Sequence, residues 1–378
     1  MTEPPRKRRN IEGLRNKGNF FEFLPIEIIH YIISFFSIPD CLELLRSISK
    51  ASTFGGLIYR SIYERTVIFS NILLRSFNNG SFRLGKAVDY QELKGIIDRE
   101  ISFVLPERFV FSYTLSHEET KSDEKFFQFF LDQFLRSERY FKLASKFELI
   151  VDLFNKQKEV NDSNNYEIKF LKNFLESDKL VNNLVNLHLS RFQNLRNTDI
   201  IEVVKRNIFR FHALQTFTLN GHNLESFQGF KLPSLLKILN LINDKIKMLP
   251  CQEDFLPEGL LCLNLSCNDL EDLKDIYFPE SLEYLDLQLN SLLTLKGMSF
   301  PESLKFLNLS GNEIMIDEAD TVILPPNLKV LNLLRNSSLH ENFQNIVLPD
   351  SLLRLYLDSL LKDFVPIDYR TQDIIMYA

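Results

Sequence analysis

Cysteine, histidine and serine are the residue types in this 378-residue chain that could carry metal or covalent chemistry. The four cysteines match neither the CxxC pairs of zinc sites nor a disulfide framework, and the six histidines are dispersed. Ser47 and Lys50 form an SxxK pattern, but the SDN and KTG segments of a serine acyl-transfer site are missing. Phosphate-binding, nucleophile-elbow and HExxH motifs are absent as well. We therefore predict no catalytic residue, no metal and no cofactor, and expect that the chain is not an enzyme.

The composition argues against nucleic-acid and membrane partners and favours an intracellular compartment. The net charge is −6 and the pI about 5.7, which argues against a nucleic-acid partner. The longest apolar run, Ile28 to Ile38, is too short to span a bilayer, so no membrane partner is expected. Free thiols in apolar runs favour a reducing compartment, nuclear or cytoplasmic.

The first nineteen residues form a polar tail with a basic cluster, Arg6 to Arg9, after two prolines. Two interpretations stay open: a nuclear-import signal, or a disordered basic tail without a function.

A short helical module follows from Phe20. Pro25 suits the first turn of a helix, and apolar residues then occupy nearly every side of it. Asp40 can cap a second, leucine-rich helix. A unit of about 45 residues has little interior in which to bury these side chains. They either bind another protein or pack on the following domain, and the physical argument alone does not separate the two.

The order of residues in this module is specific. It runs Leu24, Pro25, Glu27, Ile28, then Pro39, Asp40, then Leu44, Leu45, Ser49, Lys50. The stretch resembles an F-box, although the aromatic residue that often follows Ser-Lys is replaced by Ala51, with Phe54 further on. The resemblance implies docking on a Skp-type adaptor and, through it, a cullin–RING ubiquitin ligase. The implied adaptor contacts are Leu24, Pro25, Ile28, Ile29, Ile32, Leu42, Leu45, Ile48 and Ser49.

The second half of the chain is periodic. Six segments share the frame LxxLxLxxN, and their first leucines are 22 to 24 residues apart: Leu236, Leu260, Leu282, Leu304, Leu328 and Leu352. This frame resembles a leucine-rich repeat. The leucines of each LxL alternate with exposed residues, as in a strand with one buried face, and stacked strands would share one core. We interpret the Asn slot (Asp244, then Asn268, Asn290, Asn312 and Asn336) as structural, because an amide can bond backbone groups of adjacent turns.

Earlier turns of the same kind are longer. Segments 184–189 and 214–219 fit the frame, with Phe192 and His222 in the Asn slot, and 199–209 between them is expected to be helical. Alternating strands are expected near 109–115 and 147–153, with a helix over 123–139. Repeats of 22 to 24 residues, each with a proline, leave little room for an outer helix.

The third and fifth positions of each frame should point to the concave face of such a solenoid. One column is largely apolar and the next is largely Asn, which would suit an extended peptide. Alternatively, the Asn column is a ladder that bonds to itself, and the apolar column is covered by a loop or tail. The predicted target-binding residues are Ile238, Asn264, Tyr284, Asp286, Phe306, Asn308, Val330, Asn332, Arg354 and Tyr356.

The predicted fold is α/β: a three-helix F-box followed by a leucine-rich-repeat solenoid with a curved parallel sheet, outer helices in early repeats and a short irregular outer face in late ones. The predicted boundaries are a tail (1–19), F-box (20–68), helix-rich linker with irregular early repeats (69–180), repeats (181–363) and C-terminal cap (364–378). The predicted function is substrate recognition for an SCF ubiquitin ligase, with an unknown target protein on the concave face. The alternative is a repeat scaffold or regulatory subunit outside any ligase.

Overall fold

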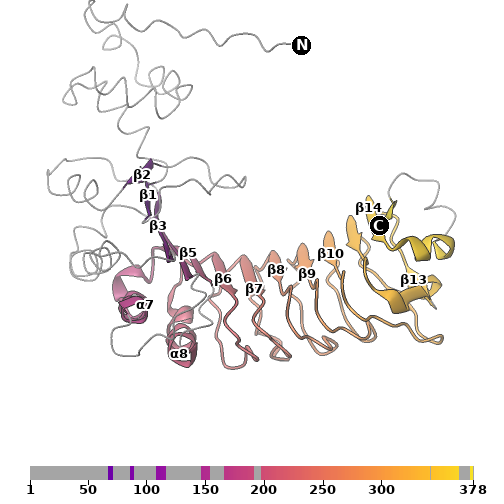
Figure 1. The fold of residues 1–378 in the computed structure, drawn as a ribbon, viewed down its shortest axis with the longest axis horizontal. Helices are drawn as coiled ribbons and strands as arrows, with labels where there is room; N and C mark the ends of the chain where they lie inside the picture. The colour runs from indigo at the N-terminus through magenta and orange to yellow at the C-terminus, as the bar shows by residue number, and fades with distance from the viewer. Residues whose placement is uncertain are drawn as a thin grey trace, which may run out of the picture.

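The computed structural model of the chain describes residues 67–70, 86–88, 108–115, 146–153, 166–190, 197–340, 342–365 and 375–377. The basic tail, the predicted F-box up to residue 66 and the helix expected over 123–139 lie outside these residues. Within them, the chain forms a curved solenoid (Figure 1), with a row of strands along one side and the returning segments along the other.

Thirteen of the described strands form one sheet in which each strand pairs with its neighbours in parallel. Its order is β15-β14-β12-β10-β9-β8-β7-β6-β5-β4-β3-β1-β2, so the chain advances along the sheet one turn at a time except at β1 and β2. The bounds are β1 (Val67–Ser70), β2 (Lys86–Val88), β3 (Arg108–Leu115), β4 (Lys146–Leu153), β5 (Leu184–Ser190), β6 (Thr216–Asn220), β7 (Ile238–Ile242), β8 (Cys262–Asn264), β9 (Tyr284–Asp286), β10 (Phe306–Asn308), β12 (Val330–Asn332), β14 (Arg354–Leu357) and β15 (Ile375–Tyr377).

Leucines of the repeating frame build the core. In β7, for example, Leu239 and Leu241 are fully buried, while Ile238 and Asn240 on the opposite face are half-buried. The first leucine of the frame, Leu236, lies two residues before β7 begins and is also fully buried. The same three positions are buried in every later turn, and together they form one continuous apolar cluster along the solenoid. The predicted parallel solenoid is therefore confirmed.

Helices cover the outer side of the early turns only. α7 (Tyr166–Leu175) lies between β4 and β5, and α8 (Asn197–Asn207) lies between β5 and β6. The two helices pack side by side, and α7 buries Leu171, Phe174 and Leu175 in the core. From β7 onward the described returning segments contain no α-helix, as the short repeat length predicted.

The outer side of the last turns has short elements that the repeat frame did not predict. β11 (Val322–Ile323) and β13 (Ile346–Val347) form a separate two-stranded parallel sheet. Short 3-10 helices complete this side and the C-terminal end: η7 (Ser337–His340), η8 (Phe343–Asn345) and η9 (Ser359–Phe364). Two others, η5 (Asp178–Leu180) and η6 (Ile208–Arg210), lie at the early turns.

A ladder of buried side chains joins the turns at the end of each strand. Asn268 Nδ2 donates to the carbonyl oxygens of Leu241 in the preceding turn and Leu265 in its own, at 2.7 and 2.8 Å. Its Oδ1 accepts the backbone N–H groups of Asp244 and Ile246, at 3.0 and 3.1 Å. The same pattern of donation to both turns recurs at Asn290, Asn312 and Asn336. The predicted structural role of the Asn slot is thus confirmed.

The residue just before the Asn slot adopts a left-handed backbone conformation in six successive turns. Its φ lies between +54° and +77° at Gly221, Asn243, Cys267, Leu289, Gly311 and Arg335. This conformation lets the chain leave the strand while its N–H still bonds the next turn; that of Gly311, for example, donates to the Leu334 carbonyl oxygen at 2.8 Å. Only glycine adopts such a φ without steric cost, so the other residues here add local strain.

Candidate protein-binding face

Ten predicted target-binding residues lie on two adjacent columns of the inner, strand-bearing side of the solenoid (Figure 1). Cross-strand register pairs each residue with its counterpart one turn away. We call the first set the apolar column: Ile238, Cys262, Tyr284, Phe306 and Val330. We call the second set the amide column: Asn240, Asn264, Asp286, Asn308 and Asn332. Arg354 and Tyr356 continue the two columns on β14.

The apolar column is only half-buried. All five of its side chains are intermediate in exposure, whereas the leucines on the opposite side of the same strands are fully buried. Tyr284 and Phe306 stack face to face, with ring centroids 4.3 Å apart and planes 5° apart. Neighbouring side chains thus shield one another but leave apolar surface on the inner face, which suits a protein partner.

The amide column does not form the self-bonding ladder that was one of the two alternatives left open by the sequence. The Oδ1 atoms of Asn264, Asn308 and Asn332 each accept the backbone N–H two residues later, at 2.9 to 3.2 Å. These local bonds occupy the backbone N–H that would otherwise continue the strand, so β8, β10 and β12 stop after three residues. A continuous ladder along this column is therefore wrong.

Two amide groups of the column stay available for a partner. Among the described residues, the Nδ2 atoms of Asn264 and Asn332 have no hydrogen-bond partner, and both side chains are half-exposed. By contrast, Asn240 Nδ2 donates to Thr218 Oγ1 and Asn308 Nδ2 donates to Gln288 Oε1, both at 3.0 Å. The free donors lie on β8 and β12, two and five strands beyond β6, on either side of the aromatic pair on β9 and β10.

Asp286 places a carboxylate at the centre of the face. It is 8% exposed; its Oδ1 accepts the Gln288 backbone N–H at 3.0 Å, and its Oδ2 accepts the Tyr284 hydroxyl at 3.2 Å. Burial, with the Asp286 charge as a second cause, raises the pKa of the Cys262 thiol to about 11 and raises the pKa of Tyr284 as well. Neither side chain ionises at neutral pH, so Cys262 is a poor nucleophile here.

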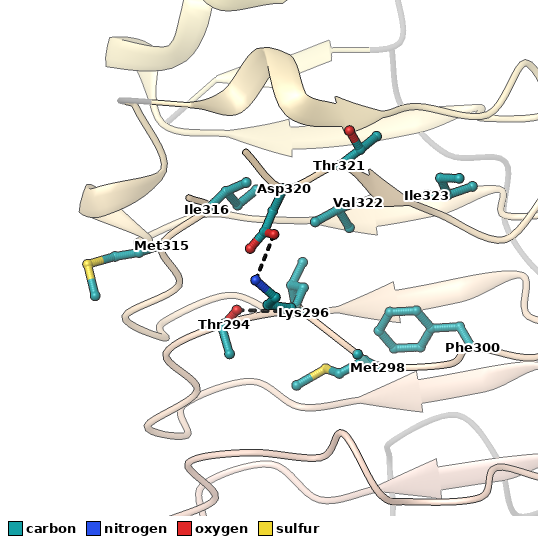
Figure 2. Close-up of a pocket in the computed structure, with 12 residues that line it drawn as sticks. Thr294, Lys296, Met298, Phe300, Met315, Ile316, Asp320, Thr321, Val322 and Ile323 are labelled. Atoms are coloured by element: carbon teal, nitrogen blue, oxygen red, sulfur yellow. Dashed lines mark hydrogen bonds and ion pairs between the residues drawn. The ribbon is translucent and has the colours of Figure 1, made fainter. Parts of the chain in front are cut away.

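A small pocket lies on the outer side, away from this face. Its volume is about 120 Å³, and it is bounded by Leu295 to Phe300 on one side and by β11 on the other. Figure 2 shows that two residues of the pocket lining, Lys296 and Asp320, form an ion pair, with Nζ and Oδ1 2.8 Å apart. Because this ion pair already neutralises the pocket's charges, we assign no ligand to it.

The segment from Asp317 to Asp320, which we call the acidic insertion, is hydrogen-bonded to the next turn. Asn342 Nδ2 donates to the Ile316 carbonyl oxygen at 2.7 Å, and Asn345 Nδ2 donates to the carbonyl oxygens of Asp317 and Glu318. The side chains of Asp317 and Glu318 are exposed. The insertion thus belongs to the packed outer face of the last turns.

Comparison with known families agrees with this geometry. A model of the leucine-rich repeat family matches residues 259–314, which include β8, β9 and β10. These turns are leucine-rich repeats. The repeats imply protein partners in general, since their inner face presents side chains from successive strands on one surface. A search of curated proteins found no match to the chain.

The predicted adaptor contacts, from Leu24 to Ser49, lie outside the described residues and outside the matched segment. Among the described residues, no cluster of His, Cys, Asp and Glu could hold a metal ion. None of the helices that the structure describes is long and apolar enough to cross a membrane.

Proposed function

We propose that this chain is the substrate-recognition subunit of an SCF-type ubiquitin ligase. Residues 20–68 would bind the Skp-type adaptor through the predicted contacts, and the adaptor would connect to a cullin–RING ligase. The inner face of the repeats would hold the target protein. The F-box-like order of residues from Leu24 to Lys50 supports the first part, and the half-buried apolar column supports the second.

The main support for this proposal is that five consecutive strands place apolar side chains in register on one half-exposed face. An extended segment of a target could lie across these strands. Its side chains would contact the apolar column, and its backbone carbonyl groups would accept hydrogen bonds from Asn264 and Asn332 Nδ2. Apolar area and a few hydrogen bonds of this kind are what protein interfaces use.

In this proposal the chain supplies position and no bond-making chemistry. Holding a target beside a charged ubiquitin-conjugating enzyme raises the effective concentration of its lysines. We accordingly propose that the protein is not an enzyme and that it acts inside the cell, in the nucleus, the cytoplasm or both.

Adaptor binding can be tested by co-purification. The full chain is expressed with its host's Skp-type adaptor and analysed by size exclusion, beside a Leu24→Ala/Pro25→Ala variant. A one-to-one complex that this variant loses, and that a Phe306→Ser variant keeps, is the expected result. A folded chain that ignores the adaptor would contradict the ligase role and favour a repeat scaffold outside any ligase.

Target binding can be tested by comparing the two sides of the solenoid. Proteins crosslinked to the full chain in its host cells are compared between Tyr284→Ser/Phe306→Ser and Ile323→Ser. The first variant alters the inner face, and the second alters an outer residue that is 76% exposed. Partners lost only with the inner-face variant, and stabilised in cells when the chain is deleted, are expected. Equal losses with both variants would argue against the inner face as the binding site.

A further inference from the structure

Asp286 is the one charged residue at the inward positions of β6 to β12. Between Leu214 and Asn336, every other residue at the inward positions of the frame is uncharged. The residues paired with Asp286 on the adjacent strands are Asn264 and Asn308. A single negative charge therefore stands at the middle of a neutral surface.

The structural role of Asp286 does not need its charge. Its Oδ1 accepts the N–H of residue 288 just as the Oδ1 atoms of Asn264, Asn308 and Asn332 accept the corresponding N–H groups in their turns. An asparagine would make this bond equally well. The charge is thus left without a function in folding, and a charge that is 92% buried costs free energy when no cation compensates it.

No cation of the described chain compensates Asp286. None of the described ion pairs includes it. Lys305, which precedes Phe306 in the next turn, forms its ion pair with Glu283, with Nζ and Oε1 2.7 Å apart. Arg354, at an inward position, lies three strands away on β14.

Aromatic surface lies directly beside the carboxylate. Tyr284 donates its hydroxyl hydrogen to Asp286, and Phe306 covers one face of the Tyr284 ring. The opposite face of that ring is on the side of Cys262, which has the smallest side chain of the apolar column. A flat cation could contact the ring there and the carboxylate at its edge.

We propose that this place binds an arginine side chain of the target protein. The guanidinium group is planar, stacks on aromatic rings and donates paired hydrogen bonds to a carboxylate. The remaining N–H groups of the guanidinium would face Asn264 Oδ1 in the amide column. This inference rests on the proposed target-binding role of the inner face and specifies the chemistry that the face selects.

The test uses a display library of random 12-residue peptides selected on the full chain. We expect selected peptides that bind the wild type and fail on Tyr284→Ser/Phe306→Ser to share an arginine. Replacing that arginine by citrulline, its neutral isostere, should weaken binding about tenfold or more, as for other close charge pairs at interfaces. Asp286→Asn should weaken the arginine peptide by a similar factor and leave the citrulline peptide unchanged.

Two further variants sharpen the result. Cys262→Ile, which copies the residue of the preceding turn, should reduce arginine-peptide binding by covering the Tyr284 ring. Asp286→Asn/Asn332→Asp keeps the net charge but moves it two strands away, and it should not restore binding of the same peptide. If peptide binding depends on Tyr284 and Phe306 but requires neither a cation in the peptide nor Asp286, the proposed arginine site is wrong. The proposed function would then stay intact. If selected peptides bind regardless of the inner-face variant, the proposed function itself fails.

Discussion

The backbone N–H of His222 donates a 2.6 Å hydrogen bond to Asp244 Oδ1, within the ladder that asparagines build in later turns. His222 Nε2–H donates in turn to the Leu189 carbonyl oxygen of the preceding turn at 2.9 Å, so the imidazole replaces an amide. Asp244 accepts in the same way as an asparagine but cannot donate when ionised. Its Oδ2 is buried without a hydrogen-bond partner among the described residues.

Asp244→Asn should stabilise the protein. By analogy with Asn268, the new Nδ2 would donate to the carbonyl oxygens of Leu219 and Leu241, where the carboxylate now offers only an acceptor. We expect the free energy of unfolding at pH 7.5 to rise by about 1–3 kcal/mol, measured by urea denaturation. Asn268→Asp, the reverse change one turn later, is the matched control and should destabilise by a similar amount. Destabilisation by both changes would mean that the His222 turn needs a carboxylate.

The same pair should give opposing pH dependences. Burial raises the pKa of Asp244 from 3.8 to about 7 and lowers the pKa of His222 from 6.5 to about 4. The contribution of Asp244 to the free energy of unfolding is complete below about pH 4 and is lost as the pH rises through about 7. The contribution of His222 is complete above about pH 6.5 and is lost as the pH falls through about 4. Relative to wild type, Asp244→Asn should therefore gain stability as pH rises across this interval, and His222→Asn should lose it. Denaturation midpoints at several pH values between about 4 and 8 would show this, and parallel curves for the two variants would contradict it.

Asparagines of the two columns should differ in their effect on stability. Asn290 is buried and bonds the Leu270 N–H and the carbonyl oxygens of Leu265 and Leu287. Asn290→Ala leaves these groups unsatisfied, so we expect a loss of about 3 kcal/mol. Asn264→Ala loses one bond to a half-exposed N–H and should cost about 1 kcal/mol or less. Thermal unfolding followed by circular dichroism would rank the variants, and equal losses would refute the distinction.

Gly311→Ala should destabilise through the backbone. Gly311 has φ +68°, and an added Cβ would lie 2.7 Å from Leu289 Cδ2. The exposed Leu289 side chain can move, so the left-handed φ sets most of the cost, about 1–2 kcal/mol. Gly259→Ala is the control, because a Cβ there meets nothing within 4 Å; it should be neutral or slightly stabilising. A neutral result for Gly311→Ala, measured by urea denaturation, would show that this turn can relax.

The sequence predicted the features that depend on short-range periodicity. The buried leucines, the inward columns and the Asn slot follow from the position of a residue in its turn, and the structure confirms all three. Of the early outer helices, α8 was predicted at 199–209, whereas no helix was predicted at the position of α7.

Features that depend on contacts between distant turns were not predicted. β11 and β13 have two residues each, too few to show alternation, and they exist because neighbouring turns place them side by side. β15 was expected as part of a C-terminal cap, but it adds a strand to the sheet beside β14. The bond from Asn264 to the N–H of Ser266 depends on the backbone course after the strand, although Asn or Asp two residues before a turn is a usable signal for it.

The arrangement of the ladder has a mechanical consequence. Each turn bonds only to its two neighbours, so a pull along the row of strands loads the interfaces between turns in series, and all of them carry the same force. Such an array yields at its weakest junction. Asp244 lacks the donor that Asn268, Asn290, Asn312 and Asn336 supply to the turn before them, and so the solenoid should separate between β6 and β7, while the turns from Leu236 to Asp358 stay assembled as one elastic segment.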